Sequence, residues 1–190
     1  MSTTAIDMDR LNSFVGRFVN DLGAAVHAGM VVIGEKTGLY KALANMPMTS
    51  AELAKQTATD ERYVSEWLAS QAAGGYIDYD RKTEKYSLNP EQAFTLANEQ
   101  SPAYLPGAFE LALGSLAAVP RIAESFKTGA GMGWHEHADG VYHGCEKFFR
   151  PVMPRTLSVP GFPLWKALRR SSNEALGSRT LDAEKGLQLF

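Results

Sequence analysis

The chain has 190 residues, of which 45% are hydrophobic and 21% charged, and its net charge is −2. This composition is typical of a globular protein and excludes a disordered chain, while the single cysteine, Cys145, excludes a disulfide scaffold. The weak negative charge gives no positive field that would attract nucleic acid. No apolar run is long enough to span a bilayer and the N-terminus lacks a signal-peptide pattern, so we expect a cytoplasmic protein without membrane contact.

Residues 7–45 are predicted to form a long amphipathic helix, or a pair of helices. Gly38 is expected to separate the long helix from a short one at residues 39–44. A helix this apolar needs a partner, and two partners remain open: the rest of its own domain, or a second subunit. The apolar residues recur mostly at steps of three and four: Leu11, Phe14, Val15, Phe18, Val19, Leu22, Ala25, Val26, Met30 and Ile33.

Two short helices are predicted next. Thr49 and Glu52 have the spacing of a capping box, which predicts a helix to about residue 56. Asp60 is expected to cap a second helix over residues 61–73.

The alternation of residues 76–79 and 85–88 predicts a β-hairpin, which completes the pattern of a winged helix-turn-helix. Such a motif reads DNA with its second helix, which needs cations toward the phosphates. Here residues 49–89 hold seven acidic and five basic side chains. Because carboxylates are repelled by phosphates, nucleic-acid binding is not expected despite the motif.

A helical connector with breaks is expected after the hairpin. Pro102 is predicted to open one helix at its first turn. The apolar periodicity continues through residues 109–126, with a kink near Gly114 or Pro120. Residues 146–153 are predicted to be helical again.

Trp134, His135, His137 and His143 are the candidate substrate-lining residues, because imidazole can donate or accept a proton near neutral pH. With Cys145 they also suggest a metal site, but the spacing fits no zinc motif and there is one cysteine. No metal ligand and no catalytic residue is therefore assigned. A Cys–His pair would lack a third, orienting residue, so Cys145 is expected to be a buried, inert thiol.

Seven stretches stand out as a set: residues 14–43, 48–54, 63–68, 74–77, 86–88, 134–137 and 146–151. Together they resemble the N-terminal part of class I S-adenosylmethionine-dependent methyltransferases, most closely the mycobacterial-type small-molecule group with an N-terminal winged-helix domain. The resemblance covers about residues 8–158. It implies a winged helix that pairs two copies into a homodimer and closes over a small-molecule acceptor. It also implies a following Rossmann-like domain that holds S-adenosylmethionine.

The strand, glycine loop and helix of that cofactor domain are missing from this sequence. The glycine-rich segment 129–133 follows a helix rather than a strand and is interpreted as a hinge loop, and Gly186 has no apolar strand before it. We therefore expect a mainly α fold without a Rossmann-like domain, no cofactor-binding residue, and a chain that is inactive alone. The alternative left open is a winged-helix transcriptional regulator that responds to a ligand.

Three regions follow from these patterns. Residues 1–95 are expected to form the long helix and the winged-helix dimerisation domain, and residues 96–158 the substrate-capping connector. Residues 159–190 differ in charge, with five basic and three acidic side chains, a net +2, against −4 for residues 1–158.

We interpret residues 159–190 as a frameshifted tail. If the last base of each codon is read with the first two of the next, residues 177–186 permit Val-Ala-Asp-Val-Gly-Cys-Gly-Lys-Gly. That string is the strand and glycine loop that the resemblance implies. Residues 159–166 likewise permit Pro-Trp-Leu-Pro-Ala-Leu-Glu, in which the single codon of Trp165 forces the final Glu.

Overall fold

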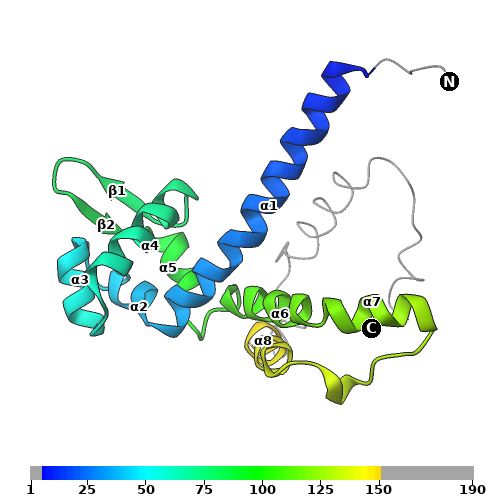
Figure 1. Ribbon diagram of the computed structural model, residues 1–190. Helices are drawn as coiled ribbons and strands as arrows, with labels where there is room; N and C mark the ends of the chain where they lie inside the picture. Colours follow the sequence, from blue (N-terminus) through cyan, green and yellow to red (C-terminus); the bar gives the residue numbers. More distant parts are fainter. Residues whose placement is uncertain (1–5, 151–190) are drawn as a thin grey trace, which may run out of the picture. The chain divides into compact units, whose positions relative to one another are not determined.

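The computed structural model describes residues 6–150, so the predicted frameshifted tail lies outside the described residues (Figure 1). The described chain is mostly helical, as predicted, and its two strands pair as an antiparallel hairpin rather than as part of a Rossmann-like sheet. In chain order the elements are α1 (Met8–Lys36), α2 (Leu39–Leu43), α3 (Ser50–Thr57), α4 (Glu61–Ala73), β1 (Asp78–Asp80), β2 (Lys85–Ser87), α5 (Pro90–Leu96), α6 (Pro106–Ala117), α7 (Val119–Thr128), the 3-10 helix η1 (Trp134–Glu136) and α8 (Asp139–Phe149).

The first two helices follow the predicted division. The Asp7 side chain caps α1 by accepting hydrogen bonds from the backbone N–H groups of Asp9 and Arg10. Gly38 has φ of 75°, a left-handed conformation that favours glycine, and it separates α1 from α2. None of the helices within residues 6–150 is long and apolar enough to cross a membrane.

The winged helix is confirmed element by element. Thr49 and Glu52 form both hydrogen bonds of the capping box at α3, and Asp60 caps α4. In the hairpin Tyr79 pairs with Tyr86, and an isolated bridge between Met48 and Tyr86 joins the segment before α3 to β2. Local signals in the sequence therefore place α3, α4 and the hairpin of this domain.

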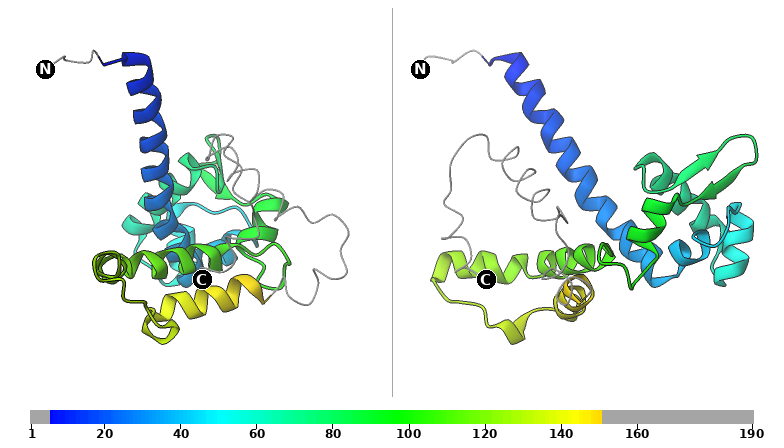
Figure 2. Two further views of the ribbon diagram at one scale, coloured as in Figure 1. Left: turned by 90° about the vertical axis from the view of Figure 1, so that its right-hand side faces the viewer. Right: turned by 180° about the vertical axis from the view of Figure 1, so that it is seen from behind.

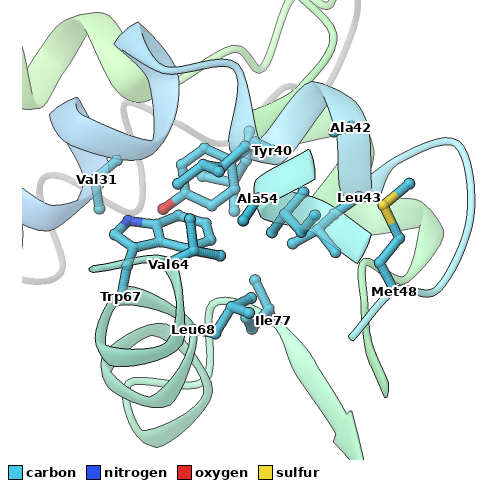
Figure 3. Close-up of a cluster of buried hydrophobic side chains, with 13 residues drawn as sticks. Val31, Tyr40, Ala42, Leu43, Met48, Ala54, Val64, Trp67, Leu68 and Ile77 are labelled. Carbon is cyan, nitrogen blue, oxygen red and sulfur yellow. The ribbon is translucent and has the colours of Figure 1, made fainter. Parts of the chain in front are cut away.

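A hydrophobic core holds the winged helix against the C-terminal end of α1 (Figure 3). The Trp67 ring meets the Tyr40 ring edge to face at 5.0 Å, and its Nε1–H donates to the Met30 carbonyl at 2.8 Å. The Tyr40 hydroxyl donates to Gln71 Oε1 at 2.5 Å. The apolar members of this core are Val31, Leu39, Tyr40, Ala42, Leu43, Met48, Leu53, Ala54, Val64, Trp67, Leu68, Ile77 and Leu96.

Glycines let α6 and α8 approach closely. A Cβ atom on Gly144 of α8 would lie 2.3 Å from the backbone nitrogen of Leu111, and one on Gly114 of α6 would lie 2.6 Å from the backbone nitrogen of Val141. Both neighbours are backbone atoms, which cannot move aside easily. Figure 2 shows α8 lying across α6, and α1 reaching the same group of helices with its C-terminal end.

The structure corrects two predictions in the connector, the helix start at Pro102 and the start of the last helix. Pro102 opens no helix: Ser101 Oγ accepts a hydrogen bond from Ala103 N–H, which forms a turn, and the helix begins at Pro106 instead. The break in the following helical stretch falls at Ala118, between α6 and α7, and therefore near Pro120, one of the two predicted positions.

The last described helix, α8, begins at Asp139 rather than at residue 146. Gly140 and Gly144 lower its intrinsic helix propensity, and the sequence therefore predicted a helix that begins only after them. The close packing of those same glycines on α6 outweighs that penalty. Helix α5 was not predicted as a separate element, although Asn89 and Gln92 form a capping box at its start.

Candidate functional site

A cavity of about 330 Å³ lies where the C-terminal end of α1 meets the loop before α6, α6 itself and α8. Its walls are mostly charged. The lining residues are Glu35, Lys36, Glu99, Tyr104, Glu110, His143, Glu146, Lys147 and Arg150.

Lys147 stands at the centre of the ionic network of this cavity. Its Nζ lies 3.0 Å from Glu35 Oε1 and 2.9 Å from Glu110 Oε2, and Lys36 Nζ lies 3.0 Å from Glu110 Oε1. Glu110 is only 6% exposed. A buried carboxylate is tolerated only when cations compensate its lost hydration, so the two lysines hold Glu110 in place.

The pKa values of the network follow from this geometry. Burial raises the pKa of Glu110, but hydrogen bonds from Lys147 and Lys36 outweigh burial and leave it lowered. Burial lowers the pKa of Lys147, but hydrogen bonds to Glu110 and Glu35 outweigh it and leave it raised. Burial, and then the negative charge of Glu35, raises the pKa of Tyr104, whose hydroxyl donates to Glu35 Oε1 at 3.4 Å. All of these groups therefore keep their usual charge states at neutral pH.

The charges at the rim of the cavity are paired as well. Glu99 forms an ion pair with Lys41, whose hydrogen bond lowers the pKa of Glu99, and Arg150 forms one with Glu146. Each cation that lines the cavity thus has a carboxylate partner, and no activated nucleophile is present among the lining residues. The network joins α1, α6 and α8 through ion pairs.

The four predicted substrate-lining residues fall in two places. The Trp134 ring lies 5.4 Å from the His137 ring and 5.3 Å from the Tyr142 ring, and the Tyr142 hydroxyl donates to the Trp134 carbonyl. His135 lies beside Gly133 at the start of the same short helix. His143, one turn along α8, lines the ionic cavity instead.

The segment around Trp134 is fixed by polar contacts on α7 and η1. The carboxylate of Glu136 accepts a hydrogen bond from the Gly133 backbone N–H, which lowers its pKa, and it pairs with Arg121 at 3.6 Å. Arg121 also donates to the Gly131 carbonyl at 3.1 Å. Trp134 itself is 61% exposed, so its ring presents an open aromatic face.

The structure also bears on the predictions made for Cys145, for a metal site and for the glycine-rich segment 129–133. No group of three or more His, Cys, Asp or Glu side chains within residues 6–150 is arranged to hold a metal ion. Cys145 is half-buried rather than buried. The glycine-rich segment 129–133 connects α7 to η1 as a loop, with a helix before it, so this segment lacks the preceding strand of a dinucleotide-type glycine loop.

The ionic network itself was not predicted from the sequence. One signal was present: Glu110 is the single charged residue of α6, a helix of otherwise apolar and small residues. A lone acid that is buried in such a helix needs a cation beside it. The cation, Lys147, lies far along the chain, and its position opposite Glu110 depends on how α8 packs against α6.

Comparison with known proteins finds one matching family model and several solved structures with a similar fold. Residues 25–98 match the family model of the Rv2258c-like winged HTH domain. No curated protein sequence matches the chain significantly. The fold is similar to the mitomycin 7-O-methyltransferase MmcR, with 20% identity and a TM-score of 0.56 over 76% of this chain and 46% of that chain. An O-methyltransferase family protein from Burkholderia thailandensis gives 13% identity and a TM-score of 0.56 over 83% of this chain and 47% of that one.

Human N-acetylserotonin methyltransferase, solved in complex with SAM, gives 13% identity and a TM-score of 0.54 over 88% of this chain and 50% of that one. The chain therefore spans about half the length of the solved methyltransferases it resembles. Identities this low compare folds only. The likeness in fold, with the match at residues 25–98, confirms that the chain has the winged-helix fold found in the N-terminal part of O-methyltransferases.

Proposed function

We propose that this chain is the N-terminal, subunit-pairing and substrate-capping part of an S-adenosylmethionine-dependent methyltransferase. The observation that carries the proposal is the likeness in fold to O-methyltransferases, which covers 76% and 83% of this chain and so reaches beyond the winged helix at residues 25–98. The proposed division is a dimerisation domain at residues 1–95 and a capping connector at residues 96–158. Two copies pair through α1.

The proposed acceptor is a small apolar or aromatic molecule that receives a methyl group on O, N or C. The open face of Trp134, with His137 and Tyr142 against it, supports an acceptor-facing role, because an exposed aromatic ring can stack on an apolar ligand. His135 belongs to the same segment. His143 is proposed as a more distant member on the ionic cavity.

The 190-residue chain is proposed to be inactive alone, because its glycine-rich segment 129–133 lacks the preceding strand of a dinucleotide-type glycine loop. Titration of the purified protein with S-adenosylmethionine in a calorimeter should give no stoichiometric heat. Tight, stoichiometric uptake of the donor would overturn the proposal.

The proposed frameshift is tested through the gene. Its codons for residues 177–186 should encode Val-Ala-Asp-Val-Gly-Cys-Gly-Lys-Gly when read one base earlier. Inserting one nucleotide at the Ser158 codon should then give a chain that takes up S-adenosylmethionine, with the unaltered gene as the control. Codons that lack this string in the shifted frame would contradict the frameshift.

The competing function is a winged-helix regulator that responds to a ligand. The charge on α4 opposes it, because Glu61 and Glu66 are exposed on the helix that would enter the major groove. A salt-dependent gel shift with duplex DNA separates the two functions. A DNA band that is shifted by the protein, and whose shift weakens steeply with added salt, would favour the regulator.

A further inference from the structure

An exposed apolar stripe runs along the N-terminal part of α1. Figures 1 and 2 show this part of the helix, in blue, extending beyond the winged helix. No residue from 8 to 26 is buried by any other part of the chain that the structure describes. The residues of this α1 stripe are Met8, Leu11, Val15, Phe18, Leu22 and Ala25.

The spacing of the α1 stripe is that of a coiled coil. Its members follow one another at steps of three, four, three, four and three, which are the a and d positions of successive heptads. Phe14, Val19 and Val26 flank the stripe and widen it. The outer face of the same helix is polar, with Ser13, Arg17 and Asn20, so the apolar residues are confined to one side.

The helix packs on its own domain with a different side. Ala28, Val31 and Gly34 are the buried residues of α1, and Trp67 and Tyr40 close on Gly34. At 3.6 residues per turn these three lie roughly opposite the α1 stripe around the helix. The stripe is therefore not an extension of the core of its own domain.

We propose that the α1 stripe pairs antiparallel with the α1 stripe of a second copy of this chain. This inference rests on the subunit pairing proposed above and specifies its direction and register. Val15 lies opposite Phe18 of the second copy, Leu11 opposite Leu22, and Met8 opposite Ala25, with a two-fold axis between Gly16 and Arg17. The α1 stripe of one copy therefore contacts the α1 stripe of the other, as an isologous two-fold interface requires.

The sizes of the side chains select this direction. In the antiparallel register the largest and the smallest side chains do not face their own kind: Phe18 lies opposite Val15, and Ala25 lies opposite Met8. In a parallel pair Phe18 would face Phe18 and Ala25 would face Ala25, leaving one layer crowded and one empty. Well-packed interfaces have uniform density, so the antiparallel pair fills the space better.

The area of the stripe also suits a second copy. Eight large apolar side chains between Met8 and Val26 are 40–63% exposed, along about 28 Å of helix. A standard interface buries about 800 Å² per partner, and half-exposed side chains of this number supply area of that order.

Disulfide trapping tests both the partner and the direction. Cys145→Ala removes the single native thiol, and Leu11→Cys and Leu22→Cys are made separately in this background. Oxidation of a mixture of the two variants should give a covalent dimer, whereas oxidation of each variant alone should not, because only residues 11 and 22 of different copies lie opposite each other. Dimers from each variant alone would overturn the antiparallel direction.

Light scattering on the full chain tests pairing without cysteines. Phe18→Asp should raise the dissociation constant of the dimer roughly 30-fold or more, since it places a charge in the central layer. Asn20→Asp, on the polar face of the same helix, should leave it unchanged. A monomeric parent chain would overturn the proposal, and protection of Leu11→Cys from a maleimide in that monomer would show that the chain's own residues cover the stripe. DNA binding, which would contradict the proposed function, leaves the trapping pattern unchanged, so the two failures are distinct.

Discussion

Tyr40 shows how one side chain serves both apolar packing and a polar bond in the winged-helix core. Its ring packs on Trp67, and its hydroxyl donates to Gln71 Oε1, both in fully buried positions. Burial raises the pKa of Tyr40 well above its usual value, so the hydroxyl keeps its proton and remains a donor.

Tyr40→Phe should lower the free energy of unfolding by about 1–3 kcal/mol, because it keeps the ring and leaves the buried Gln71 oxygen unpaired. Urea unfolding followed by circular dichroism measures the difference. Tyr79→Phe, on the exposed hairpin, is the matched control and should change stability by less than about 0.5 kcal/mol. Equal effects for the two variants would show that the Tyr40 hydroxyl contributes nothing.

His27 makes stability depend on pH at the junction of α1 and the winged helix. Its ring lies 4.3 Å from the Tyr76 ring and against Gly74, and burial lowers its pKa from 6.5. The unfolded chain therefore takes up this proton first, and stability falls as pH drops through about 6.5. His27→Phe should unfold with more similar urea midpoints at pH 7.5 and 5.5 than the parent. His135→Gln should keep the parent's pH dependence, and an unchanged dependence in His27→Phe would contradict this assignment.

At the scale of whole elements, the contact of α6 with α8 depends on missing side chains. Gly144→Ala places a methyl group 2.3 Å from the backbone nitrogen of Leu111, and we expect a loss of about 1–3 kcal/mol from overpacking. Thermal unfolding measures it. Gly131→Ala is the control, because a Cβ there meets nothing within 4 Å. A variant at Gly144 as stable as this control would show that α8 can shift without cost.

The elements also show what the sequence can and cannot predict. Thr49 and Asp60 act on neighbouring backbone N–H groups, so their signals are local and α3 and α4 were placed correctly. The start of helix α8 was predicted too late because Gly140 and Gly144 lower the local helix propensity. The reason for glycine at these positions is the close contact with α6, which the sequence does not reveal. The site divides in the same way: Trp134 and His137 are close in sequence and meet, whereas the partners of Glu110 come from distant helices.

At the scale of the whole molecule, Lys147 joins the winged-helix half to the connector, because it pairs with Glu35 of α1 and Glu110 of α6. Removing a buried partner leaves uncompensated charge, which costs several kcal/mol. Lys147 is one-third exposed, so solvent screening reduces that cost. Lys147→Met should therefore lose about 2–3 kcal/mol, whereas Lys127→Met, which breaks an exposed pair with Glu124, should lose under about 1 kcal/mol.

The pH dependence of this pair provides the decisive measurement. The pKa of Glu110 is lowered from 4.5, so its contribution is present above pH 4.5 and is lost as pH falls through the lower, folded value. The pKa of Lys147 is raised from 10.5, so its contribution is lost only as pH rises through a still higher value. The stability difference between the parent and Lys147→Met should then be full at neutral pH and shrink in acid as Glu110 takes up a proton. A difference that persists unchanged in acid would show that Lys147 acts through its packing and not through its charge.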